Sequence, residues 1–126
     1  MKYSPQLMEA FLHPQHAGRL ENATSSGIAH HPTCGDTTRI FLRVEDGKVA
    51  DASFQASGCG PGIACASVLL QRVVGQSVTA AASFTAHDVA SALDLPAAKH
   101  HCAELAVGAL RQALDQKAVQ TGGDLP

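Results

Sequence analysis

Residues 37–57 read TTRIFLRVEDGKVADASFQAS, and this stretch decides the fold. In the first run, 37–44, apolar side chains alternate with arginine and phenylalanine, and a second run follows at 49–57. Asp46-Gly47 lies in the short connection between them. Because Asp-Gly between two alternating runs is the strongest short-range signal for a β-hairpin, we expect two antiparallel strands here.

Upstream of the hairpin the sequence predicts one helix and an irregular segment. Ser4 before Pro5 is a fair N-cap, and apolar residues follow at helical spacing as far as Leu12. Pro14 ends this helix. The segment 17–34 is rich in Gly, Asn, Ser, Thr and His, so we expect it to be irregular, with a short strand at 28–30.

Downstream of the hairpin the pattern is helical. A glycine turn at 58–62 precedes an Ala-rich helix at 63–74, and a short helix is expected at 77–82. Thr85 opens the next helix, and Pro96 lies in the first turn of a longer final one. The apolar stripe of that helix comprises Leu105, Ala106, Ala109, Leu110 and Leu114. The prediction is an α+β fold, a small three-stranded antiparallel sheet with helices packed on one face.

Composition narrows the classes of function. The 126 residues suit a single domain, 1–126, with a core of about 3–118 and a frayed tail at 121–126. Nine basic and eleven acidic residues give a net charge of −2, which argues against nucleic-acid binding. No apolar run approaches the length of a membrane span, and residues 1–18 do not form an export signal. We therefore expect a cytoplasmic protein with reduced thiols and no membrane partner.

The candidate functional residues are three cysteines, with an aspartate, a histidine and a lysine close to them in the sequence. Cys34 precedes the first hairpin strand and Cys59 follows the second, so antiparallel pairing brings both to one end of the sheet. Cys102 lies on the final helix beside His101, and Lys99, one turn earlier, would favour its thiolate. With Asp36, these donors suit zinc, iron or an iron–sulfur cluster.

These residues resemble a known family. The strings Cys34-Gly35-Asp36, Phe54 to Ala64 and Leu95-Pro96-Ala97-Ala98-Lys99-His100-His101-Cys102, together with Tyr3 and Pro14 to Gly18, resemble the IscU/NifU-type iron–sulfur cluster assembly scaffolds. The similarity runs from about residue 3 to 118 in matching order and spacing.

The resemblance implies a carrier rather than an enzyme. Such a scaffold takes sulfur from a cysteine desulfurase, collects iron, builds a transient [2Fe-2S] cluster and passes it to apo-proteins. Carried over by position, the ligands of cluster or metal are Cys34, Cys59, Cys102, Asp36 and His101. Lys99 would support the last ligand, Gly58 and Gly60 would allow the turn, and Cys102 would accept persulfide.

The sequence departs from the family in places. The stretch 95–99 keeps the ends of the family's chaperone-binding Leu-Pro-Pro-Val-Lys motif and loses its middle, which puts an Hsp70/J-protein partnership in doubt. We expect the stand-alone form of the scaffold, as monomer or dimer. Cys65 has no counterpart in the family and is expected to pack in the core.

Other interpretations of the same residues stay open. Each cysteine could be a small buried hydrophobe, and Asp36 could cap a turn. His30, His31 and His100 are expected to be solvated. A second hypothesis is a zinc-bound sulfur acceptor, similar to the SufU type, which relays persulfide without holding a cluster, and a third is a structural zinc module. Zinc hydrolase motifs are absent from the sequence.

Overall fold

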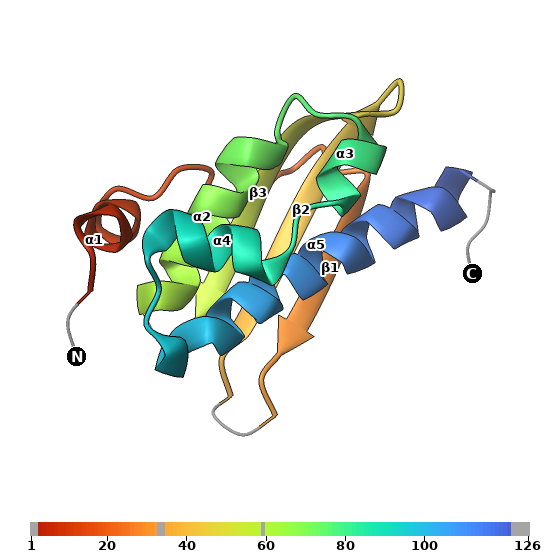
Figure 1. Ribbon diagram of the computed structural model, residues 1–126. Coiled ribbons are helices and arrows are strands. Elements are labelled where there is room, and N and C mark those ends of the chain that lie inside the picture. Colours follow the sequence, from red (N-terminus) through yellow and green to blue (C-terminus); the bar gives the residue numbers. More distant parts are fainter. Residues whose placement is uncertain (1–2, 33–34, 59, 122–126) are drawn as a thin grey trace.

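Three antiparallel strands form the sheet, and helices cover one of its faces (Figure 1). The computed structural model describes residues 3–32, 35–58 and 60–121. The strands, in the order β1-β2-β3, are β1 (Ser25–His30), β2 (Thr37–Glu45) and β3 (Lys48–Ser57). The helices are α1 (Pro5–Leu12), α2 (Gly60–Val73), α3 (Val78–Ala82), α4 (Ala86–Leu93) and α5 (His100–Thr121), with a 3-10 turn, η1 (Ala97–Lys99), before α5. The predicted fold class is confirmed.

The β2–β3 hairpin forms where the Asp-Gly signal predicts it. Asp46 and Gly47 have φ angles of 52° and 75°, the positive values that a tight two-residue hairpin turn requires. The pairing runs from Glu45 opposite Lys48 to Thr37 opposite Ser57. The hairpin is therefore continuous from its turn to the opposite end of the sheet, apart from a register shift at Arg43/Val44.

Three predicted boundaries differ from the structure. β1 begins at Ser25 and is longer than the expected strand at 28–30, because it pairs with β2 along its whole length. α2 begins at Gly60, so residues 60–62 form its first turn, where proline is well tolerated. Pro96 precedes η1 rather than lying in the first turn of α5. The predicted tail falls almost wholly at 122–126, outside the described residues.

Two helix starts follow the predicted capping chemistry. The Ser4 side chain accepts the backbone N–H of Leu7 at 3.0 Å. At α4 the Thr85 N–H donates to Asp88 Oδ2 at 2.9 Å, and the Asp88 N–H donates to Thr85 Oγ1 at 3.2 Å. Hydrogen bonds to Thr85 lower the pKa of the Asp88 carboxyl, and the bond from the Thr85 backbone has a larger effect than that from its side chain. These bonds therefore stabilise the folded protein fully at pH values above the pKa that Asp88 has in the unfolded chain. Their contribution is lost as the pH falls and Asp88 becomes protonated in the folded protein.

The core lies between the sheet and the helices and consists mainly of small aliphatic side chains. Alternation along β2 turns Ile40, Leu42 and Val44 toward the helices. They join buried residues of α2 and α5 in one cluster, which includes Leu69, Leu70, Ala106 and Leu110. Within the described part of the chain, no helix is both long and apolar enough to cross a membrane.

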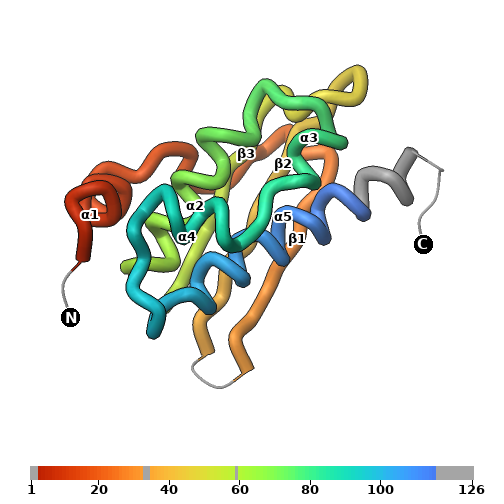
Figure 2. Tube along the Cα trace, viewed as in Figure 1, coloured from red at the N-terminus to blue at the C-terminus, as the bar shows by residue number. Residues whose placement is uncertain are grey.

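β1 and α5 approach each other closely in this core, and Figure 2 shows α5 passing over β1. A Cβ placed on Gly27 would lie 2.2 Å from the carbonyl oxygen of Ala109 and 2.7 Å from the nitrogen of Ala113. The Ile28 N–H donates to Gln112 Oε1 at 2.7 Å, so the strand is also bonded to the helix side chain. Only glycine allows the two backbones to come this close.

Replacing Gly27 with alanine should separate β1 from α5. We expect Gly27→Ala to lower the free energy of unfolding by about 2 kcal/mol or more, since the added methyl group meets backbone atoms that cannot rotate away. Gly108→Ala is the matched control on α5, because its Cβ would meet the Ala29 methyl at an ordinary 3.8 Å. It should leave stability unchanged or raise it by about 0.5–1 kcal/mol. Urea unfolding of both variants measures the difference, and equal stabilities would contradict the constraint.

Candidate metal centre

Several elements converge at the end of the sheet opposite the β2–β3 turn. Thr37, the first residue of β2, pairs with His30, the last of β1, and with Ser57, the last of β3. Asp36 directly precedes β2 and Gly58 directly follows β3. The chain therefore enters β2 and leaves β3 at the same end of the sheet.

The β1–β2 connection is closed by two backbone hydrogen bonds. The His31 N–H donates to the Asp36 carbonyl at 2.8 Å, and the Gly35 N–H donates to the His31 carbonyl at 3.0 Å. Gly35 has a φ of 77°, a conformation that favours glycine. These bonds hold Asp36 at a fixed place beside the sheet.

Three unlike donor atoms meet at this place. The Nε2 atom of His101 lies 3.3 Å from Asp36 Oδ2 and 3.6 Å from Cys102 Sγ. A carboxylate oxygen, an imidazole nitrogen and a thiol sulfur, one from each of these residues, all lie within 4.8 Å of one another. Asp36 comes from the β1–β2 connection, whereas His101 and Cys102 lie in the first turn of α5. The fold thus brings together donors that are 65 residues apart in the chain.

The separations suit a tetrahedral metal ion. Zinc bond lengths to nitrogen, oxygen and sulfur imply tetrahedral edges of about 3.4 Å for N···O and about 3.6 Å for N···S. The two contacts of His101 Nε2 measure 3.3 Å and 3.6 Å. The remaining edge, from Asp36 to Cys102, is at most 4.8 Å and would need to shorten by at most about 1.2 Å. The donors present therefore fit a metal ion after a small movement of one side chain.

The absence of a side chain at Gly58 makes room for the Asp36 carboxylate. A Cβ at Gly58 would lie 2.2 Å from Asp36 Oδ1 and 3.1 Å from Asp36 Cβ. Gly58 also has a φ of 121°, which side-chain-bearing residues rarely adopt. The glycine thus leaves room for the carboxylate beside the strand end, which gives the predicted supporting residue a physical role. Gly60 is close-packed as well, because its Cβ would lie 3.0 Å from the Phe11 ring.

Cys102 is fully buried, at 0% exposure, while the side chains of Asp36 and His101 are 15% and 21% exposed. Another molecule can reach its sulfur only after surrounding residues move. Lys99 is half-buried at the end of η1, three residues before Cys102. Its expected effect on the Cys102 thiolate stays a prediction.

The other predicted cysteines divide into two groups. Cys34 and Cys59 lie outside the described residues, so their expected convergence stays a prediction. Gly58, adjacent in sequence to Cys59, does contact Asp36, two residues after Cys34. Cys65 is buried in the core cluster on α2, in agreement with the expected packing role.

One histidine was misjudged from the sequence. His30 and His100 are exposed as expected, but His31 is half-buried and its ring lies 4.6 Å from that of His101, centroid to centroid. The alternation of side chains along β1 could have indicated that His31 lies on the helix side of the sheet. Gly27 and Ala29 face α5, so the next odd-numbered residue continues on the helix side.

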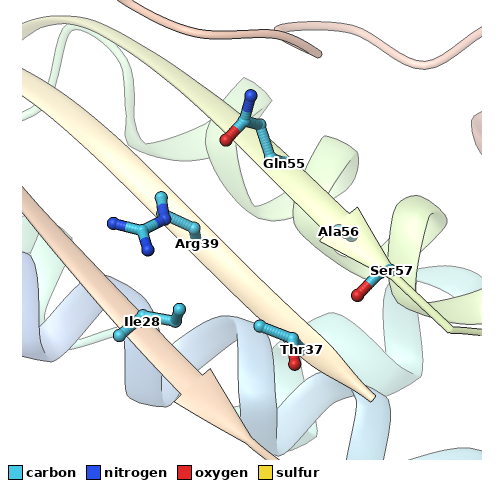
Figure 3. Close-up of a pocket in the computed structure, with 6 residues that line it drawn as sticks. All are labelled: Ile28, Thr37, Arg39, Gln55, Ala56 and Ser57. Atoms are coloured by element: carbon cyan, nitrogen blue, oxygen red, sulfur yellow. The ribbon is translucent and has the colours of Figure 1, made fainter. Parts of the chain in front are cut away.

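The uncovered face of the sheet carries a separate hollow of about 240 Å³, shown in Figure 3. Its lining residues come from all three strands: Ile28, Thr37, Arg39, Gln55, Ala56 and Ser57. Of the predicted ligands that the structure describes, Asp36, His101 and Cys102, none lines it. The hollow therefore plays no part in the donor group.

Comparison with known sequences gives consistent matches over nearly the whole chain. The family described as "NifU-like N terminal domain" matches residues 2–121. The iron–sulfur cluster assembly scaffold protein IscU 1 of Archaeoglobus fulgidus is 36% identical over 113 residues, which cover 89% of this chain and 74% of that protein. IscU of Escherichia coli K12 is 34% identical over 118 residues, covering 90% and 92% of the two chains.

Solved structures share the fold. A nitrogen-fixing NifU-like protein (N-terminal) from Brucella abortus aligns with a TM-score of 0.78 at 19% identity, covering 91% of this chain and 93% of that one. A putative iron–sulfur cluster assembly scaffold protein for the SUF system from Fervidobacterium islandicum aligns with a TM-score of 0.75 at 21% identity, covering 89% and 96%. At these identities the likeness establishes the architecture alone.

The contact between Gly58 and Asp36 can be tested by substitution. We expect Gly58→Ala to lower the free energy of unfolding by about 1–3 kcal/mol, because of its φ angle, and to displace the carboxylate. Zn²⁺ affinity, measured by competition with a chromophoric chelator, should fall by roughly 10-fold or more. Gly62→Ala is the control, since its Cβ would meet nothing within 4 Å. If both variants bind Zn²⁺ like the native protein, Gly58 does not position Asp36.

Proposed function

The chain belongs to the NifU-like N-terminal domain family and is an iron–sulfur cluster assembly scaffold of the IscU/NifU type, and from this premise we propose that it builds [2Fe-2S] clusters. Iron and sulfide are its cargo rather than a resident cofactor. Sulfur comes from a cysteine desulfurase, and the finished cluster passes to apo-proteins. The chain acts as a carrier and catalyses no turnover of its own.

The observation that carries this proposal is the meeting of Asp36, His101 and Cys102 at one end of the sheet. Thiolate ligands suit iron–sulfur clusters, and an imidazole can replace a thiolate on one iron. The proposed cluster thiolates are Cys34, Cys59 and Cys102, with Asp36 and His101 as additional ligands. A carboxylate is a harder ligand than a thiolate, so its presence makes iron easier to exchange.

Sulfur delivery would be a thiol exchange. The thiolate of Cys102 attacks the outer sulfur of the desulfurase persulfide, the sulfur–sulfur bond breaks, and the desulfurase cysteine leaves as a thiolate. Each transferred sulfur then needs two electrons from an external reductant before it becomes sulfide. Because Cys102 is buried, this exchange requires local opening around the first turn of α5.

A second candidate function is a zinc-bound sulfur acceptor that relays persulfide without holding a cluster. The observation in its favour is the agreement of the His101 contacts with the edges of a zinc tetrahedron. Asp36, His101 and Cys102 would bind the ion with Cys34 or Cys59 as fourth ligand. Desulfurase turnover that rises with zinc-loaded protein, while no cluster can be reconstituted, would favour this function over the scaffold.

Anaerobic reconstitution tests the scaffold function. The 126-residue chain is incubated with ferrous iron, cysteine, a thiol reductant and a cysteine desulfurase, and the visible absorption of a [2Fe-2S] cluster is recorded. We expect Cys102→Ala to lose most of this absorption, because a cluster thiolate is removed. Cys65→Ala is a closely matched control, since both cysteines are fully buried in helices of the same core cluster.

The control separates ligand loss from core damage. Both substitutions remove one buried sulfur and should cost similar stability, about 1–2 kcal/mol, but only Cys102→Ala should lose the cluster. If Cys102→Ala or Cys59→Ala reconstitutes like the native protein, the ligand assignment is wrong. Iron and acid-labile sulfide analysis of the same samples, read together with the absorption spectrum, gives the cluster type.

A further inference from the structure

We propose that His31 is a positioning residue that orients the His101 imidazole toward Asp36 and Cys102. This inference rests on the proposed function of the same donor group. No motif of the sequence singled out His31, and its side chain is neither one of the three converging donors nor a residue of the core. Its role follows from the way β1 and α5 pack.

The register in which β1 packs against α5 brings His31 next to His101. β1 and α5 run antiparallel, since Gly27 lies against Ala109 and Ala113 while Ala29 lies against Gly108. From residue 27 to residue 31 an extended chain advances about 13 Å. From residue 109 back to residue 101 a helix covers about 12 Å. Counted from the contact of Gly27 with Ala109, the two histidines therefore lie at about the same level.

The alternation of β1 gives His31 the correct face. His30 lies on the uncovered side of the sheet, where its Nδ1 contacts Thr37 Oγ1 at 3.0 Å. The next residue turns to the helix side, and there its ring meets that of His101 at a centroid distance of 4.6 Å and an interplanar angle of 56°. Distance and tilt both lie in the favourable range for a pair of aromatic rings.

This contact restrains the ring whose direction matters most in the donor group. His101 Nε2 faces both Asp36 Oδ2 and Cys102 Sγ, so rotating the imidazole would break both contacts at once. His31 also closes the turn that holds Asp36, through its own backbone N–H and carbonyl. His31 thus contacts both parts of the donor group: its backbone bonds to the turn that holds Asp36, and its ring packs against His101 on α5.

The geometry favours positioning over direct ligation. Among the described residues, the donors that lie within 4.8 Å of one another are those of Asp36, His101 and Cys102, and no nitrogen of His31 belongs to that group. The His31 ring contacts the ring of a proposed ligand, His101. Residues that orient metal ligands in this way typically change metal affinity by 10- to 100-fold when they are removed.

The zinc affinities of three variants of the 126-residue chain test the proposal. Zn²⁺ is titrated in competition with a chromophoric chelator, and Co²⁺ absorption reports the geometry of the bound ion. We expect His31→Ala to weaken Zn²⁺ binding by roughly 10-fold and to alter the Co²⁺ spectrum. His31→Phe, which keeps a ring against His101, should stay within about threefold of the native affinity. His30→Ala is the control on the neighbouring residue and should bind like the native protein.

Each outcome is decisive. Native affinity in His31→Ala overturns the proposal. A loss in His31→Phe as large as that in His31→Ala also overturns it, because the nitrogen rather than the ring would then be required. Thermal unfolding without metal detects general destabilisation, and the comparison is made only at temperatures where all variants are folded.

The proposed function fails in a different way. If Cys102→Ala binds Zn²⁺ like the native protein and also reconstitutes a cluster, the donor group itself is misassigned. If Cys102→Ala loses binding and His31→Ala does not, only the role of His31 is wrong. The two failures therefore give different patterns across the same set of variants.

Discussion

The close approach of β1 to α5 at Gly27 is the constraint on which the rest of the structure depends. A carbonyl of Ala109 lies where any side chain at Gly27 would begin, so strand and helix can pack at this depth in essentially one register. That register fixes which residues meet at the far end of the pair. There the first turn of α5, with His101 and Cys102, reaches the connection that holds Asp36. A backbone contact in the core thus determines the geometry of the donor group.

The hairpin and the family resemblance made much of this fold predictable. The Asp46-Gly47 turn, the Ser4 cap and the Thr85–Asp88 box are local signals, and local signals can be recognised in a sequence because the residues that make them are neighbours. The length of β1 was underestimated because Ser25 and Ser26 have weak strand preference and owe their conformation to pairing with β2. The conformation of such a segment is determined by its tertiary contacts rather than by the strand propensity of its residues.

The donor group was only partly predictable, for the same reason. Antiparallel pairing indicates which end of the sheet the cysteines flank, but spacing alone does not show how α5 approaches that end. Asp36, His101 and Cys102 were therefore brought together by resemblance, not by derivation. His31 had neither motif nor resemblance to mark it. Its position depends on the depth of packing at Gly27, and that depth becomes visible only once the helix is placed on the strand.

The donor group also has a property that suits a carrier. His101 Nε2 lies within hydrogen-bonding distance of the Asp36 carboxylate and close to the Cys102 sulfur, so the three groups can satisfy one another when no metal joins them. A buried polar group that loses its partner costs about 1–3 kcal/mol, and these mutual contacts would reduce that cost on release of cargo from the proposed site. The aliphatic core, from Leu7 to Ala113, lies alongside the site and includes only Cys102 of the three donors. Release of a metal or cluster from this proposed site would therefore change the contacts of a few side chains at one end of the sheet, while the packing of β1 against α5 would keep them in place to bind again.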